Sequence, residues 1–263
     1  MSVRVDLQSP RVLAPLPERL RDVKLIGLGG VGGIVARYGA LYLSALDEAT
    51  RLVLIDGDVF EPKNASRMLF SSHGNKASVV CEDLMRAVDE SFLSVVAIEE
   101  FVTDKNLPRL IREGDTVLLA VDNHATRKLV SDYVRDKLND VCLISGGNEG
   151  AGSDSTGVIQ RGTYGNVQIY LSQEGIDITP ALTQFHPEIE SPADQLPNEV
   201  SCTDALSSTP QILFANLAVA SSILNAFWLH LCGVLHYPEV CFDIHDARMQ
   251  PMPLPSTLRA PRR

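Results

Sequence analysis

The sequence predicts an α/β fold, a Rossmann-like doubly wound and mostly parallel sheet with antiparallel additions toward the C-terminus. Three observations predict it. Apolar strand-like runs alternate with helical segments across residues 22–148, as in a parallel sheet that helices cover on both faces. A glycine-rich turn joins the first strand-like run directly to the first helical segment. Beyond residue 148 the apolar pattern changes to period two, which indicates antiparallel strands.

The first half begins with an expected strand over residues 22–29, which runs into the glycine turn, and an expected helix over residues 31–46. The next expected strand, residues 51–58, ends in acidic residues. The later elements continue the alternation: a helix over 75–88, a strand over 93–102, a short helix over 106–113, a strand over 115–122, a helix over 124–139 and a strand over 141–148.

The second half has a different pattern. Residues 155–162 and 164–172 alternate with period two and predict antiparallel strands. Residues 173–210 carry five prolines and predict a long irregular crossing segment, and such segments in compact domains are usually functional or mobile. Residues 211–235 are long enough to cross a bilayer, but polar side chains interrupt them, so we interpret them as a buried or interface helix. The tail over residues 251–263 is expected to be extended.

Size and charge limit the possible partners. The chain has 263 residues, of which 45% are hydrophobic, and this is enough for one large α/β domain. It carries 33 acidic and 23 basic residues, a net charge of −10, whereas nucleic acids and anionic membranes attract a positive field. We therefore expect no nucleic-acid partner and no membrane partner, and a small ligand or a protein partner instead.

The cysteine pattern and the N-terminus indicate a cytoplasmic location. The five cysteines form no CxxC pair, so they suggest neither a disulfide framework nor a four-cysteine zinc site. The histidines and cysteines near the C-terminus lack a full set of metal-ligand spacings, and they are read as core and surface residues. Residues 1–20 lack the uninterrupted apolar stretch of a secretory signal.

The glycine turn is the first candidate binding site. Gly27, Gly29 and Gly32 match G-x-G-x-x-G between a strand and a helix, and Gly30 lies in the same turn. Missing side chains let backbone N–H groups approach phosphate at the positive end of the helix dipole. Asp56, at the end of the second strand, is placed to accept hydrogen bonds from both hydroxyls of a ribose. These five residues predict a nucleotide with a free 2′-hydroxyl, but they do not distinguish NAD from ATP.

The residues that follow Asp56 add a more specific pattern. The stretch "DGDVFEPKNASRMLF" continues with "SSHGNKA", and "AVDNHATR" comes later. On these residues the sequence resembles the ThiF/MoeB/HesA family of adenylating enzymes, which share their fold with ubiquitin-activating enzymes. The family pattern is acid-x-acid, Asn-x-x-Arg, a Lys that opens a helix and an Asp that ends the fourth strand. The matching positions here are Asp56 and Asp58, Asn64 and Arg67, Lys76, and Asp122.

The resemblance implies an enzyme that binds ATP and Mg²⁺ and activates the C-terminal carboxylate of a small ubiquitin-like or sulfur-carrier protein. Such a carboxylate attacks the α-phosphorus and pyrophosphate leaves, so the site must neutralise phosphate charge and hold the metal. Arg67 would supply a planar donor fork for the outer phosphates, and Lys76 a compact charge near the α-phosphate. Asp122 is expected to ligate magnesium, and Asn64 to hydrogen-bond the nucleotide or a phosphate.

The resemblance covers residues 22–148 well and the remainder loosely. It implies a single adenylation domain over residues 1–263, in which 22–148 form the nucleotide-binding half and 149–250 the partner-binding and crossover half. Asp58 and Arg127 are expected to anchor a helix or a loop. The sequence departs from the family in three places: Met68 replaces the usual Gln, the interval from Arg67 to Lys76 is short, and the zinc-binding CxxC pairs of many members are absent.

Cys202 is a further candidate, just before the apolar helix. In the family this region can carry a cysteine that receives the activated acyl group or sulfur, and a thiol there could attack the adenylate. A lone cysteine is also commonly a small buried apolar residue, and the sequence leaves both roles open.

Other functions also stay open. Some family members adenylate a peptide or a tRNA-borne carboxylate, although the acidic charge argues against tRNA. An NAD-dependent oxidoreductase would use the glycines and Asp56 but leave Arg67, Lys76 and Asp122 unexplained. A nucleotide-binding scaffold without catalysis is the third alternative. The family implies a homodimer, and the apolar face of residues 211–235 is the candidate interface.

Overall fold

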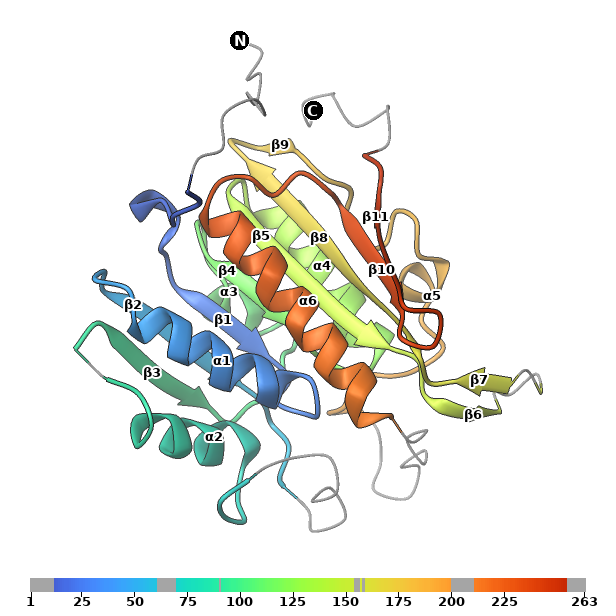
Figure 1. Cartoon of the computed structure of the whole chain (residues 1–263), viewed down its shortest axis with the longest axis horizontal. Coiled ribbons are helices and arrows are strands. Elements are labelled where there is room, and N and C mark those ends of the chain that lie inside the picture. The colour runs from blue at the N-terminus through green and yellow to red at the C-terminus, as the bar shows by residue number, and fades with distance from the viewer. Residues whose placement is uncertain are drawn as a thin grey trace.

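The computed structural model describes residues 12–60, 70–89, 91–153, 157, 159–199 and 211–254. A nine-stranded sheet runs through the molecule in the order β11-β10-β8-β5-β4-β1-β2-β3, with β9 paired to β8 (Figure 1). Its parallel strands are β1 (Val23–Ile26), β2 (Thr50–Ile55), β3 (Leu93–Ile98), β4 (Thr116–Leu119) and β5 (Val141–Asn148). The antiparallel strands are β8 (Tyr164–Gln173), β9 (Ile176–Asp177), β10 (Glu239–Asp243) and β11 (Arg248–Met252). The predicted fold class is confirmed.

Helices cover both faces of this sheet (Figure 1). One face carries α1 (Gly32–Ser44), α2 (Lys76–Met85) and α6 (Leu213–Leu231), and the other carries α3 (Leu107–Leu110), α4 (His124–Lys137) and α5 (Pro187–Glu190). A short 3₁₀ turn, η1 (Pro17–Arg19), precedes β1. Neighbouring residues of a strand point to opposite faces. Leu25 and Leu54 therefore belong to the core on the side of α1, α2 and α6, whereas Ile26 and Ile55 belong to the core on the side of α3, α4 and α5.

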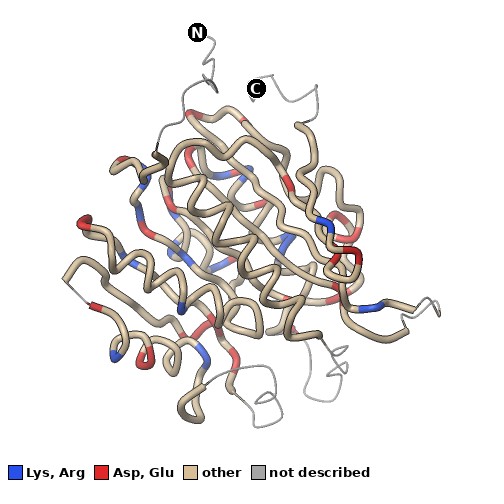
Figure 2. The backbone as a smooth tube through the Cα atoms, in the orientation of Figure 1, with Lys and Arg blue, Asp and Glu red and all other residues tan. Residues whose placement is uncertain are grey.

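Helix α6 lies directly on β5 and β8. A Cβ atom on Gly146 of β5 would come within 2.6 Å of Ile223, so this close approach requires glycine. In the part of the chain that the structure describes, α6 is the one helix long and apolar enough to cross a membrane, and half of its most apolar window is buried inside the protein. It carries no Lys, Arg, Asp or Glu, and its tube is tan throughout in Figure 2.

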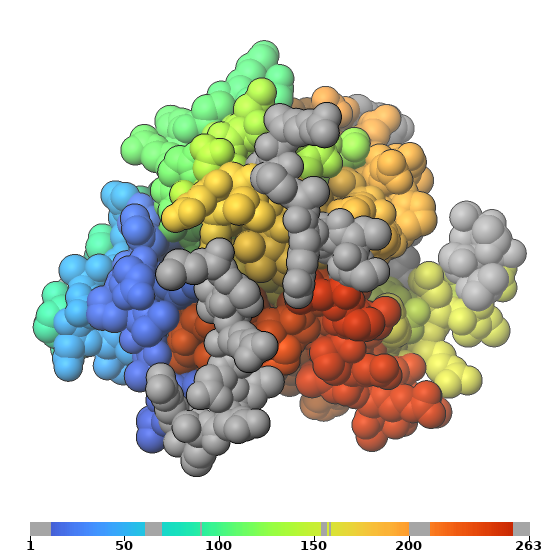
Figure 3. All heavy atoms as spheres, turned by 90° about the horizontal axis from the view of Figure 1, so that it is seen from above, coloured from blue at the N-terminus to red at the C-terminus, as the bar shows by residue number. Residues whose placement is uncertain are grey.

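Several predicted boundaries differ from the structure. The expected strand 155–162 contributes only Ile159–Arg161 (β7), which pairs with Ala151–Ser153 (β6) in a separate hairpin that projects from the side of the molecule (Figure 3). The crossing segment is not wholly irregular, because β9 and α5 lie within it. The expected short helix 106–113 is helical only over Leu107–Leu110, since the backbone at Ile111 is already extended.

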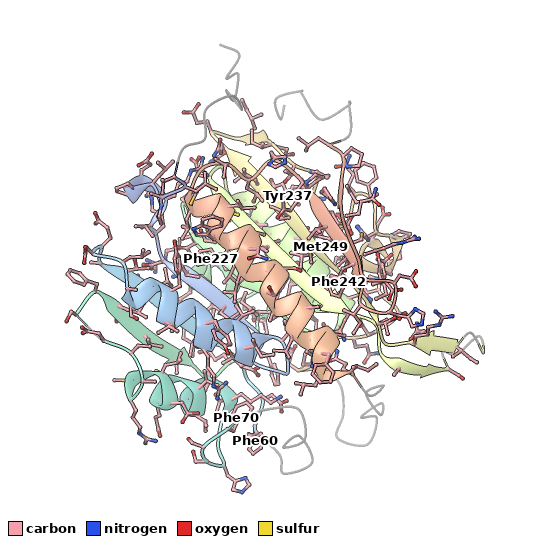
Figure 4. All side chains as sticks on the ribbon, viewed as in Figure 1. Phe60, Phe70, Phe227, Tyr237, Phe242 and Met249 are labelled. Atoms are coloured by element: carbon pink, nitrogen blue, oxygen red, sulfur yellow. The ribbon has the colours of Figure 1, made fainter. Side chains whose placement is uncertain are left out.

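The β10–β11 hairpin was missed from the sequence. Residues Val240 and Phe242 of β10 are buried and alternate with half-buried neighbours, which is the period of a strand with one face on the core. Phe242 pairs with Met249 of β11, and Figure 4 shows both beside α6. The hairpin includes the first two residues of the tail that was expected to be extended, Pro251 and Met252.

Candidate nucleotide site

The glycine turn lies between β1 and α1. Gly27 has φ +87°, and a Cβ atom there would lie 2.9 Å from the carbonyl of Ala120 in the β4 loop. A Cβ atom on Gly32 would overlap the carbonyl oxygen of Gly27. The turn therefore excludes side chains at both positions. No side chain caps α1, because its N-cap residue is Val31, so no side-chain acceptor of the protein occupies the positive end of this helix, where an anion is favoured.

Asp56 ties β2 to the glycine turn. Its two carboxylate oxygens accept from the backbone N–H groups of Leu28 (2.6 Å) and Asp58 (2.8 Å). Burial raises the pKa of the Asp56 carboxyl, against the opposing charge of Lys76 and the two N–H donors. Each oxygen keeps a second lone pair that a ribose hydroxyl could use. The predicted ribose acceptor thus also holds the turn in shape.

Lys76 opens α2 with its side chain buried. Its ammonium pairs with the carboxylate of Asp58, and its backbone N–H donates to the Asp58 carbonyl (2.9 Å). Asp58 therefore makes the contacts of a helix anchor. Because an ammonium has three donors, Lys76 can keep this pair and still meet a phosphate oxygen.

Asn75 is a site residue that the sequence analysis missed. Its side chain caps α2 by accepting from Ala77 (2.8 Å) and Ser78 (3.3 Å), and it donates to the carbonyl of Asp56 (2.9 Å). One amide thus joins the end of β2 to the start of the helix that carries Lys76. An Asn directly before a helical run is an N-cap signal, so Asn75 could have been identified from the sequence.

Asp122 follows β4 and lies beside the glycine turn. The residue before it, Val121, is in contact with this turn, because a Cβ atom on Gly27 would lie 2.9 Å from Val121 Cγ1. Its side chain is exposed, and no described residue makes a hydrogen bond or an ion pair with it. Proteins commonly bind Mg²⁺ through one or two carboxylates together with substrate phosphates. Asp122 fits that requirement. Among the residues with described positions, no cluster of three or more His, Cys, Asp or Glu side chains forms a separate metal site.

Arg127 lies under the Asp122 loop with its guanidinium buried. It donates to Ser145 Oγ (2.7 Å) and to the carbonyls of Val121 (2.7 Å) and Gly146 (2.8 Å). Burial lowers the pKa of Arg127 to about 10, and the negative charge of Asp122 opposes that shift. The side chain joins the end of β4 to β5, so Arg127 makes the contacts of a loop anchor.

The crossing segment is held by ionic contacts on the same face. His186 meets Glu188 (3.0 Å) and Glu239 (3.2 Å), and Glu239 also accepts from Asn166 (2.8 Å). Burial by itself lowers the pKa of His186, but the two carboxylates outweigh burial, so that the pKa is raised. The carboxylate of Asp194 accepts from the first backbone N–H groups of α4.

Three of the predicted site residues lie outside the described residues: Asn64, Arg67 and Cys202. On either side of the stretch that contains Asn64 and Arg67, Phe60 and Phe70 stack with ring centroids 4.4 Å apart, beside α2 (Figure 4). The four described cysteines are buried or half-buried. Burial raises the pKa of Cys142 to about 12.

The remaining predicted residues gather at one edge of the sheet. The glycine turn follows the carboxyl end of β1, Asp56 follows that of β2, and Asp122 follows that of β4. Lys76 begins α2, the helix that comes after β2 in the chain. Strand β1 lies between β2 and β4, so the chain reverses its direction across the sheet between β1 and β4. Ligands of open α/β sheets bind at such a switch point.

The fold, together with the residues at the carboxyl ends of β1, β2 and β4, defines the class of protein. It is an α/β domain of the Rossmann type with a glycine turn at its switch point. Residues 13–223 match the ThiF family, and the chain belongs to this family. The family resemblance seen in the sequence is confirmed.

Two curated relatives match just under half of the chain. One is the "Adenylyltransferase and sulfurtransferase MOCS3" of Dictyostelium discoideum, 33% identical over 127 residues, which are 48% of this chain and 27% of the relative. The other is the "Adenylyltransferase and sulfurtransferase uba4" of Emericella nidulans, 30% identical over 118 residues, which are 43% of this chain and 23% of the relative. The matched stretch is thus the smaller part of each relative.

Solved structures share the fold over most of the chain. E. coli MccB, crystallised with AMPCPP and MccA, has a TM-score of 0.62 at 15% identity and covers 90% of this chain and 65% of its own. A structure titled PaaA has a TM-score of 0.58 at 18% identity, with coverage of 90% and 65%. At these identities the likeness shows the fold.

Proposed function

We propose that the chain is an ATP-dependent adenylyltransferase that activates the C-terminal carboxylate of a small ubiquitin-like or sulfur-carrier protein. The observation that carries the proposal is the switch-point edge, where an uncapped glycine turn, the buried Lys76 and the exposed Asp122 come together. A dehydrogenase needs the turn and Asp56 for its dinucleotide but has no use for the other two residues. The ThiF match does not favour an oxidoreductase either.

Each residue has a part in this chemistry. The backbone N–H groups at the start of α1 bind phosphate, and Asp56 binds the ribose. Lys76 and Arg67 neutralise the charge that develops on the phosphates during attack, and Asn64 hydrogen-bonds the nucleotide or a phosphate. Asp122 would hold Mg²⁺, which supplies Lewis-acid polarisation of the phosphate oxygens when bound.

The nature of the partner is inferred from the relatives. Two of them are named adenylyltransferase and sulfurtransferase, and a relative in fold, MccB, was crystallised with MccA. A sulfur-carrier or ubiquitin-like protein would present a C-terminal glycine carboxylate to the glycine turn. Cys202 is the candidate thiol for a later transfer step, in a cytoplasmic enzyme whose cysteines stay reduced.

We also propose a homodimer that forms through α1 and α6. Five apolar side chains on these helices are at least 40% exposed: Tyr38, Leu41, Leu213, Phe214 and Leu217. Two copies of a chain with a net charge of −10 repel each other over most of their surfaces. Contact through the uncharged α6 avoids that repulsion.

Calorimetry with ATP and with NAD tests the nucleotide site. We expect Mg²⁺-dependent ATP binding, no NAD binding of comparable affinity, and a loss of about 1.5–3 kcal/mol in Asp56→Ala, the range for hydrogen bonds to a charged group. Lys137→Ala, an exposed change at the far end of α4, is the control. Preference for NAD would overturn the proposal.

A further inference from the structure

The crossing segment contacts the helix that follows Asp122 through one carboxylate. Asp194 accepts from the backbone N–H groups of His124 (2.7 Å) and Ala125 (2.8 Å), the first two residues of α4. The third N–H group of the turn, that of Thr126, donates to the side chain of Asn123 (2.7 Å). A residue seventy positions away in the sequence therefore completes the cap of this helix.

The backbone around Asp122 is fixed from both sides. The carbonyl of Val121, just before it, is held by Arg127, and the backbone just after it is held by Asp194. The Arg127 guanidinium has only neutral acceptors, and no carboxylate among the described residues lies within ion-pair distance of it. Asp122 and Asp194 are nevertheless near enough to oppose the effect of burial on its charge.

Other contacts hold the crossing segment independently of Asp194. Ile189 is buried against α4, Leu182 donates to Ser131 Oγ of α4 (3.2 Å), and His186 pairs with Glu239. Removing the Asp194 carboxylate would therefore leave the segment in place. This makes the carboxylate a contact that can be tested alone.

We propose that Asp194 is a positioning residue that couples the crossing segment to Asp122. While the segment lies on α4, its carboxylate fixes the first turn of that helix and, through it, the direction of the Asp122 side chain. The part concerning Mg²⁺ rests on the proposed function.

Three full-length variants test the coupling: Asp194→Ala removes both acceptors, Asp194→Asn keeps one oxygen, and Glu190→Ala is a matched control. Glu190 is an exposed carboxylate of the same segment, and it contacts no residue of α4 through a hydrogen bond. The measurements are amide hydrogen exchange over residues 120–126 and calorimetric ATP binding, with and without Mg²⁺.

In Asp194→Ala we expect about twofold to thirtyfold faster exchange at His124 and Ala125, the range for losing a capping side chain. We expect about threefold to tenfold weaker Mg²⁺-dependent ATP binding, with Mg²⁺-free binding unchanged. Asp194→Asn should lie between wild type and Asp194→Ala, and Glu190→Ala should match wild type. A merely structural cap would speed exchange without changing the Mg²⁺ dependence.

Two results overturn the inference: unchanged exchange over residues 120–126, or faster exchange with the Mg²⁺ dependence of the wild type. If the wild-type chain binds no ATP at all, the proposed function fails. The amide hydrogen exchange measurement would still decide whether Asp194 fixes the Asp122 loop.

Discussion

At the scale of single residues, two glycines of α1 differ in whether the structure has room for a side chain at their positions. A Cβ atom on Gly32 has no room, because it would overlap the carbonyl of Gly27. Gly39 lies in the middle of the same helix, and a Cβ atom there would meet only Leu224 at 3.7 Å, an ordinary contact. One glycine is required by the turn and the other is not.

We therefore expect Gly32→Ala to lower the free energy of unfolding by about 1–3 kcal/mol, as overpacking does. Gly39→Ala should leave it unchanged or raise it by up to about 1 kcal/mol, because Ala is the better helix former. Urea unfolding of the two variants measures both values. Equal stability of the two variants would contradict the described turn.

Site residues divide into those that the sequence could reveal and those that it could not. Gly27, Asp56 and Lys76 lie in one continuous stretch of alternating strands and helices, so local patterns predict their common edge. Asp194 caps α4 only because the crossing segment returns to it, and no local pattern encodes that path. Contacts of this length depend on tertiary packing.

At the scale of elements, the crossing segment is tied to β10 by a pair whose strength depends on pH. The pKa of His186 is raised by Glu239 and Glu188, and the pKa of Glu239 is lowered by His186 and Asn166 although burial opposes this. The contribution of His186 to stability is full below its unfolded pKa and is lost as pH rises through the folded value. That of Glu239 is full above its unfolded pKa and is lost as pH falls through the folded value.

The segment should therefore be most stable between the unfolded pKa of Glu239 and the unfolded pKa of His186, where both contributions are full. Amide exchange over residues 178–199, corrected for intrinsic rates, should be slower at pH 6 than at pH 9. His186→Gln should remove most of this difference. A pH difference that persists in that variant would mean that another group controls the segment.

The elements themselves were predictable to different degrees. Strands β1, β2 and β4 of the parallel half are buried almost throughout and gave apolar runs, which made them recognisable, whereas the edge strand β3 is partly exposed. Strand β11 is exposed along its whole length, so it carries no hydrophobic pattern and exists because β10 pairs with it. The hairpin β6–β7 is too short to show a period.

At the scale of the whole molecule, the exposed apolar residues of α1 and of the uncharged helix α6 are the feature that bears on assembly. The proposed homodimer places Phe214 and Leu217, which are 69% and 40% exposed in one chain, inside an interface. Exposed apolar patches of this kind mark interaction sites.

We expect sedimentation at micromolar concentration to show a dimer. Phe214→Asp and Leu217→Asp should each shift it toward the monomer, because a charge on an apolar interface must be desolvated. Ile176→Asp, an equally exposed apolar residue on β9, should not. A wild-type monomer would remove α6 as an interface.

Partner-dependent exchange of pyrophosphate into ATP tests the central claim most directly, because it reports adenylate formation alone. With a sulfur-carrier protein that ends in Gly-Gly, we predict exchange by the wild type, and none when the partner's C-terminal carboxylate is amidated. Lys76→Ala and Asp122→Ala should each reduce exchange by at least about a hundredfold, as expected for groups that stabilise developing phosphate charge. Asp47→Ala, an exposed change just beyond the C-terminal end of α1, should match the wild type. Exchange of wild-type magnitude in the Lys76 and Asp122 variants would contradict adenylation at this edge of the sheet.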